Sequence, residues 1–195
     1  MRTQFVMFLF CVFFFFYRGS TQERLSYEFY NKTERLGIGL VKIEKQLITV
    51  KNQGLSKHIE EDMYNPKHIV PLFFKPDYNI VYVVCLERQK VYYKVLSATG
   101  DIYLVPKTEA KFVSWAKFVR NTTGVTNLNW ELNPLREAPF EKSKMIRIKD
   151  KEATYQVINV KGDWIEIQNE HNAHEKGWIQ WRKADSLLIE VYLLI

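Results

Sequence analysis

Hydrophobic and polar residues alternate over short stretches along most of this chain, as they do in β-strands that bury one face. Two such stretches are residues 37–44 (GIGLVKIE) and 46–52 (QLITVKN). The polar pair Glu44 and Lys45 separates them and predicts a turn, so the two stretches are expected to form a β-hairpin.

A helical pattern is expected at residues 56–64 (SKHIEEDMY). Ser56 can cap the first turn, acidic residues lie near the start, and Pro66 would stop the helix. Because strand patterns dominate the rest, the sequence predicts a mainly all-β protein with one short helix near its N-terminal end.

The longest apolar run lies at the N-terminus, in residues 5–17 (FVMFLFCVFFFFY), and Arg2 precedes it. Thirteen helical residues span about 20 Å, which is short of the roughly 30 Å hydrocarbon core of a bilayer. We therefore expect residues 1–22 to be a secretory signal peptide, cleaved between Gly19 and Glu23, and no stable transmembrane anchor. The mature protein would then be secreted or periplasmic.

The composition fits a folded domain that needs no disulfide. The 195 residues are 47% hydrophobic, which is enough for one full core or two small ones. Removing the signal peptide takes away Arg2 and Arg18, so the net charge falls from +6 to +4, and the interspersed charges argue against nucleic-acid binding. Only Cys85 then remains, in the strand-like run NIVYVVCLE. A buried small hydrophobe is the first interpretation of Cys85, and a reactive thiol is the alternative.

Short motifs recur in the same order in the two halves of the chain, which indicates two tandem β modules of about 60 residues. The matches, each with its offset, are 71–76 with 134–139 (63), 92–95 with 164–167 (72), 102–105 with 177–180 (75) and 112–113 with 187–188 (75). The mature chain is therefore divided into residues 23–67, which hold the hairpin and the helix, a first module at 68–127, and a second module at 128–195.

Three motifs of the second copy, NPLREAPFEKSKMI, VKGDWIEIQ and KGWIQWRKADSLL, follow one another in that order. This series resembles the bacterial SH3-like (SH3b) domain, with its Arg-x-x-Pro turn, Gly-(Asp/Gly)-Trp strand and Gly-Trp-(Val/Ile) strand. The resemblance covers residues 128–195 and, more weakly, 68–120, where Ile102 and Tyr103 replace Gly-Trp. It implies two small, strongly bent antiparallel β-barrels that bind cell-wall peptides, glycans or envelope proteins.

The sequence offers no catalytic constellation. Residues 23–67 are too few for a hydrolase and contain no cysteine, so the Cys/His peptidase that often accompanies such modules is missing. A phosphate-binding glycine loop, a Gly-x-Ser-x-Gly elbow and a carboxylate pair of glycosidase type are also missing. We therefore expect a protein that is not an enzyme and has no cofactor.

Two histidines, His171 and His174, raise the question of a metal site. A zinc site needs three or four ligands, and Glu170 and Glu175 could complete one only if the loop rearranged. The surrounding residues are typical of a turn, rich in Asn and Glu. We expect a solvated loop and no metal.

Aromatic side chains at outward strand positions are the candidate ligand-binding residues: Trp164, Trp178, Tyr92, Tyr103 and Trp181. If Ile165 and Ile167 point into a barrel, alternation turns Trp164 outward, and Ile179 does the same for Trp178. Two interpretations remain open. The aromatic residues form a platform for a wall peptide, a glycan or an envelope partner, or they pack within the sheet, between modules or against a partner subunit.

Overall fold

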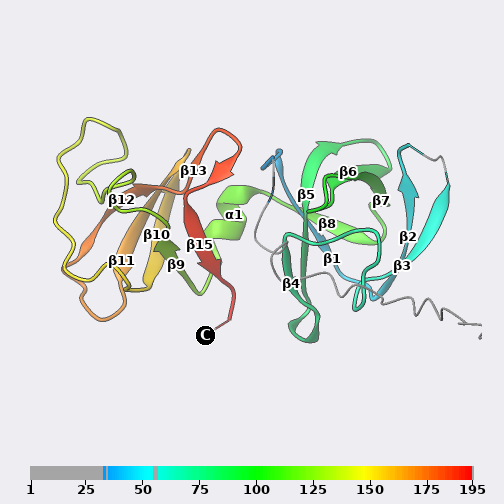
Figure 1. The fold of residues 1–195 in the computed structure, drawn as a ribbon, viewed down its shortest axis with the longest axis horizontal. Helices are drawn as coiled ribbons and strands as arrows, with labels where there is room; N and C mark the ends of the chain where they lie inside the picture. The colour runs from blue at the N-terminus through cyan, green and yellow to red at the C-terminus, as the bar shows by residue number, and fades with distance from the viewer. Residues whose placement is uncertain (1–32, 34, 55–56, 195) are drawn as a thin grey trace, which may run out of the picture.

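The computed structural model describes residues 33, 35–54 and 57–194, so the predicted signal peptide at 1–22 lies outside the described residues. Antiparallel sheets make up most of this part of the chain, which confirms the predicted all-β class (Figure 1). None of the helices described is long and apolar enough to cross a membrane.

The first sheet has eight strands and pairs them in the order β3-β2-β7-β6-β5-β1-β8, with β4 added to β5. Its strands are β1 (Gly39–Ile43), β2 (Leu47–Asn52), β3 (His58–Asp62), β4 (Phe73–Lys75), β5 (Ile80–Arg88), β6 (Tyr92–Leu96), β7 (Ile102–Pro106) and β8 (Ala110–Val113). A 3-10 turn, η2 (Pro76–Tyr78), joins β4 to β5.

The second sheet has five strands in the order β12-β11-β10-β9-β15. Its strands are β9 (Gly124–Asn127), β10 (Tyr155–Lys161), β11 (Trp164–Asn169), β12 (Lys176–Gln180) and β15 (Ile189–Tyr192), and a small hairpin of β13 (Arg182–Lys183) and β14 (Ser186–Leu187) precedes β15. Helix α1 (Trp115–Arg120) joins the sheets and lies between them (Figure 1). Ser114 caps this helix, because its hydroxyl accepts the Lys117 N–H at 3.3 Å.

The two sheets share one topology. In the first sheet β1 lies between β5 and β8, and in the second β9 lies between β10 and β15. Beyond β7 the first sheet continues with β2 and β3, and beyond β12 the second continues with single bridges to Arg136 and then Met145. The order of pairing is therefore the same in both halves of the chain, apart from β4, which has no counterpart in the second sheet.

Two expectations about the N-terminal elements were wrong. Residues 37–44 and 46–52 both contain strands, but β1 pairs with β5 and β8, while β2 pairs with β3 and β7. Within the stretch predicted as a helix, residues 58–62 form strand β3 instead, because β2 pairs with every one of them. An isolated helix of that length is marginal in water, so sheet pairing wins.

The expected boundaries also differ from the sheets. Strands β1 to β3, which fall within the expected segment 23–67, belong to the first sheet, and the second sheet begins at Gly124 instead of 128. The match of 71–76 with 134–139 does not hold either, because Phe73–Lys75 pairs with β5 whereas Arg136 pairs with β12.

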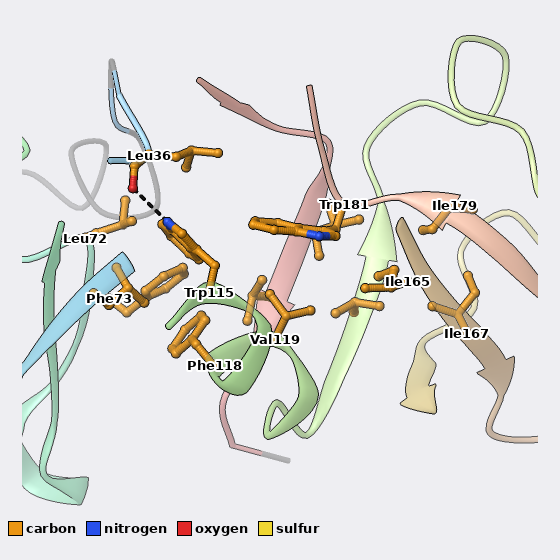
Figure 2. Packing of buried hydrophobic residues seen from close by; sticks show 14 of the residues in the cluster. Leu36, Leu72, Phe73, Trp115, Phe118, Val119, Ile165, Ile167, Ile179 and Trp181 are labelled. Carbon is orange, nitrogen blue, oxygen red and sulfur yellow. Dashed lines mark hydrogen bonds between the residues drawn. The ribbon is translucent and has the colours of Figure 1, made fainter. Parts of the chain in front are cut away.

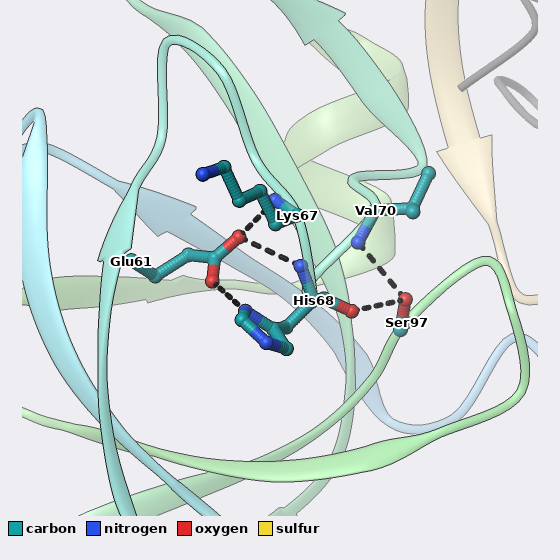
Figure 3. A network of polar contacts seen from close by, with 5 residues as sticks. All are labelled: Glu61, Lys67, His68, Val70 and Ser97. Atoms are coloured by element: carbon teal, nitrogen blue, oxygen red, sulfur yellow. Dashed lines mark hydrogen bonds and ion pairs between the residues drawn. The ribbon is translucent and has the colours of Figure 1, made fainter. Parts of the chain in front are cut away.

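A buried carboxylate fixes the connection between β3 and β4 (Figure 3). Glu61 is 2% exposed, and its Oε1 accepts the backbone N–H groups of Lys67 at 2.5 Å and His68 at 2.9 Å. Its Oε2 lies 2.6 Å from Nδ1 of His68. Ser97 extends the network by accepting the Val70 N–H at 2.9 Å. The hydrogen bonds to Glu61 replace those that its carboxylate makes with water in the unfolded chain, and so offset the free-energy cost of its burial.

One hydrophobic cluster spans both sheets and helix α1, and we call it the shared cluster. Its members include Leu36, Leu40, Leu72, Phe73, Val84, Trp115, Phe118, Val119, Val125, Tyr155, Ile165, Ile167, Ile179, Trp181 and Ile189. A separate cluster with Val41, Ile43 and Val83 fills the first sheet alone. Strand β1 is therefore buried on both faces, one face toward each cluster, which is why its sequence is apolar nearly throughout.

Trp115 lies at the centre of the junction between the sheets (Figure 2). Its ring centroid is 5.8 Å from that of Phe118 and 5.6 Å from that of Trp181. The indole Nε1 donates to the backbone carbonyl of Leu36 at 2.7 Å, and the Leu36 N–H in turn donates to Asp185 at 3.2 Å. Residues from both halves of the chain thus hold one another in a single packed region.

Cys85 is fully buried in β5, as the first interpretation expects. The pKa of its thiol is raised to about 11, because burial raises it by more than the hydrogen bond to the Glu87 carbonyl lowers it. Since the thiolate is the reactive form, we predict that iodoacetamide near pH 8 leaves the Cys85 peptide unlabelled in the native protein and labels it in guanidinium chloride. Peptide mapping by mass spectrometry measures this, and rapid labelling of the native protein would favour the reactive-thiol alternative.

Candidate functional site

The outer face of β11 and β12 carries two of the predicted aromatic residues. Along β11, Ile165 and Ile167 are buried while Trp164 is half-buried, and along β12 Ile179 is buried while Trp178 is half-buried. The alternation predicted from the sequence therefore turns both tryptophans outward.

The cross-strand register extends this face into a row of side chains. Glu166 lies directly opposite Trp178, Trp178 pairs with Arg136, and Arg136 pairs with Met145. Residues directly opposite in antiparallel strands point to the same face, so these four form a row across four chain segments. This row and the neighbouring pair Trp164 and Gln180 are called the tryptophan face: Met145, Arg136, Trp178, Glu166, Trp164 and Gln180.

Fixed polar contacts hold the charged groups of the tryptophan face. Glu166 forms an ion pair with Lys176 at 3.0 Å, and Nη1 of Arg136 donates to the Ser143 carbonyl at 2.7 Å. Met145 remains 64% exposed at the end of the row. The face thus combines anchored polar groups with open apolar area, which is the usual make-up of a binding surface.

The motif residues around the two tryptophans build the edge of this face. A Cβ at Gly177 would lie 2.7 Å from the Arg136 carbonyl, so only glycine lets the chain at Arg136 approach β12. Asn133 is buried and bonds both backbone groups of Gln180, donating to the carbonyl at 2.8 Å and accepting the N–H at 3.0 Å. These contacts explain why Gly177 and Asn133 are needed in the Gly-Trp and Asn-Pro-Leu-Arg motifs.

Of the two tyrosines predicted to point outward in the first sheet, only one does so. Tyr92 is half-buried on the outer face of β6, but Tyr103 is 4% exposed and points inward, opposite Val95. The residue of the first sheet that corresponds to Trp178 is Leu104, because each lies opposite the equivalent position of the preceding strand. The two residues are 74 positions apart, whereas the sequence match between the copies gave 75. A slip of one residue turns a strand side chain to the other face, and this slip explains the error.

Trp181 belongs to the interior, which contradicts its expected role in binding. It is 1% exposed, its Nε1 donates to the Gly162 carbonyl at 2.9 Å, and its ring packs against Trp115. Trp181 follows the buried Ile179 by two positions, so the same alternation that turns Trp178 outward turns it inward.

The loop with His171 and His174 has its own hydrogen bonds. Their backbone N–H groups donate to Asn169 and Asn172 respectively. Glu175 turns into the protein, where it accepts bonds from the Tyr155 hydroxyl and from Asn169 at 3.3 Å. Across the described residues no three His, Cys, Asp or Glu side chains gather as metal ligands.

Glu175 also affects the pKa of Tyr155, its hydrogen-bond partner. Burial, and next the hydrogen bond to Glu175, raise the pKa of Tyr155 far above its ordinary value. Tyr155 therefore stays protonated and donates to this carboxylate, so Glu175 is a structural acceptor.

A pocket of about 540 Å³ on the outer face of β9 and β15 was missed in the sequence. Trp130 and Tyr192 line it together with Glu131, Glu152 and Glu190. The indole of Trp130 is fixed, because Nε1 donates to the Lys151 carbonyl at 2.8 Å and the ring centroid lies 5.5 Å from that of Tyr155. The sequence feature that could have indicated this pocket is a tryptophan inside a polar loop, NLNWELN.

No protein-family model, curated protein or solved structure matches this chain. The geometry of the surface is then the guide to its chemistry. The tryptophan face presents two indole rings, an exposed thioether, an amide and an ion pair side by side, and such groups bind an extended ligand by stacking and hydrogen bonding.

Proposed function

We propose that this chain is a secreted or periplasmic, non-catalytic binding protein with two SH3-like modules. Its second module would recognise a cell-wall peptide or glycan through the tryptophan face. The observation that carries the proposal is the placement of Trp164 and Trp178, both outward and partly exposed on neighbouring strands.

The size of the row suits an extended ligand. It crosses four chain segments about 4.8 Å apart, so it is about 14 Å long, the length of roughly four extended residues. Aromatic faces stack on sugars and on peptide planes, while Glu166 and Gln180 supply hydrogen bonds beside them. A linear wall polymer could then lie from Met145 to Glu166.

The module assignment has two supports. The shared pairing order of the two sheets agrees with an internal repeat. The contacts of Gly177 and Asn133 also give a structural reason for motifs that resemble the bacterial SH3-like domain.

A structural or accessory role in the cell envelope is the second candidate. Trp181 favours it, because this predicted platform residue packs between the two halves of the chain instead of facing solvent. On this alternative the tryptophan face covers a partner subunit and takes no small ligand.

Replacing Trp164 or Trp178 by alanine tests the proposal. Each change removes contact area from a partly exposed face and opens no cavity, so the free energy of unfolding should fall by no more than about 1 kcal/mol. Affinity for purified peptidoglycan should fall about thirtyfold, because aromatic anchors carry about 2 kcal/mol or more of an interface.

Urea midpoints and pull-down on purified peptidoglycan at high salt measure the two effects. Tyr78→Ala is the matched control, since Tyr78 is an exposed aromatic residue in η2, away from the tryptophan face. Undiminished retention of both tryptophan variants refutes the proposal. A parent protein that ignores peptidoglycan but co-purifies with one envelope protein supports the structural role.

A further inference from the structure

A pocket of about 280 Å³ lies where the two halves of the chain meet, and we call it the junction pocket. The apolar side chains that line it are Tyr82, Val113, Phe118 and Leu193, and the polar ones are Lys42, Glu44, Lys111, Lys117 and Asn121. Phe112 also borders the pocket, but its ring lies on the opposite face of the sheet, 6.5 Å from that of Tyr93. The apolar side continues the shared cluster, because Phe118 belongs to that cluster and Tyr82, Val113 and Leu193 pack against it.

Elements from both halves are needed to form this pocket. Strands β1, β5 and β8 and helix α1 supply most of the lining, and Leu193, which follows β15 of the second sheet, supplies the rest. The ring of Tyr82 meets that of Phe118 edge-on at 5.0 Å, which fixes one wall. The pocket is therefore a product of the packed junction.

Positive charge predominates around the junction pocket. Three lysines line it against a single carboxylate, Glu44, which already pairs with Lys111 at 2.9 Å. For Lys42 and Lys117, the described part of the chain provides no ion-pair partner. Two cations thus face the pocket without a counter-charge.

The strand register makes this arrangement unfavourable when the pocket holds only water. Lys42 on β1 is half-buried and lies directly opposite Lys111 on β8, so their side chains share one face. Like charges in directly opposite positions destabilise a sheet. Glu44 offsets one of the lysines, and an anion beside Lys42 would offset the other.

We propose that the junction pocket binds a small amphipathic carboxylate, an acid group on a short apolar chain. The carboxylate would lie between Lys42 and Lys117, and the chain would lie on Val113, Phe118 and Leu193. A volume of about 280 Å³ corresponds to roughly nine water molecules at about 30 Å³ each, so a ligand of about ten non-hydrogen atoms fits. This proposal does not depend on the tryptophan face.

Octanoate is the probe, and octan-1-ol, which has the same chain without the charge, is its neutral counterpart. Titration of the full chain, followed by NMR and calorimetry, should give saturable shifts of the Val113 and Leu193 methyl signals with octanoate and much weaker shifts with octan-1-ol. The double variant Lys42→Gln with Lys117→Gln should bind octanoate at least about tenfold more weakly, because the two closest charges are gone.

Three further variants make the test specific. Lys90→Gln with Lys142→Gln changes the net charge equally at exposed lysines outside the pocket and should leave the affinity unchanged. Glu44→Gln removes the competing carboxylate, so it should raise the affinity severalfold. Lys117→Gln alone, on the exposed side of α1, preserves the fold and should still weaken binding.

The proposal fails if octanoate and octan-1-ol bind alike, or if the pocket double variant binds like the control double variant. It also fails if the shifts gather at the tryptophan face instead of at Val113 and Leu193. Circular dichroism of each variant confirms that the comparison is made between folded proteins.

Discussion

A fragment of residues 128–195 is expected to stay unfolded, whereas a fragment of residues 114–195 folds. The shorter fragment covers the whole resemblance seen in the sequence, but it lacks β9. Strand β9 lies between β10 and β15 and pairs with both, with Val125 opposite Tyr155 on one side and Val191 on the other. Without β9 the sheet order breaks at its centre, and an antiparallel sheet of separated strands has no stable core.

The longer fragment keeps two features that the shorter one loses. It retains β9, whose Asn127 donates to the Asn133 carbonyl at 2.6 Å, and it retains Trp115, which covers Trp181. Far-UV circular dichroism and urea unfolding measure the difference. A cooperative β transition in the 128–195 fragment would show that β9 is dispensable, and the described topology would then be the wrong basis for dividing the chain.

Local patterns in the sequence predict which residues are buried, because side-chain alternation along a strand is a local property. The outward positions of Trp164 and Trp178 and the burial of Cys85 follow from this alternation alone. The all-β class follows for the same reason. These features needed no knowledge of which strand pairs with which.

Pairing between strands depends on residues far apart in the chain, and the local pattern of the sequence predicted it wrongly. The stretches of β1 and β2 are neighbours in the chain, yet each finds its partners elsewhere. The inward turn of Tyr103 shows the same limit, since one residue of register decides its face. Helix α1 was missed because it is short and its apolar side is defined only by the two sheets that it separates.

The shared cluster also could not be read from one sequence. Leu40 and Val41 are adjacent in β1 and belong to different hydrophobic clusters, so their apolar character does not reveal that one of them faces a second sheet. Trp181 was assigned to a binding surface although alternation from Ile179 turns it inward. Its partner Trp115 is far away in the chain and contacts it only in the folded protein.

Trp115→Ala is expected to have the largest effect of any single substitution in the junction. The change removes a buried indole between Phe118 and Trp181 and leaves the Leu36 carbonyl without its donor. Truncating a buried tryptophan costs about 3–5 kcal/mol, a large part of the stability of a domain of this size. Urea unfolding measures the loss, and Trp164→Ala, on the outer face of β11, is the control with an expected loss of no more than about 1 kcal/mol.

The shape of the unfolding transition carries further information about the junction. If the shared cluster couples the two sheets, the parent should unfold in one transition, and Trp115→Ala should separate it into two, because each sheet then unfolds by itself. Trp115→Phe keeps a ring in the cluster and loses only the indole N–H, so it should cost less and preserve the single transition. Two transitions already present in the parent, or an unchanged midpoint in Trp115→Ala, would mean that the junction does not couple the unfolding of the two sheets.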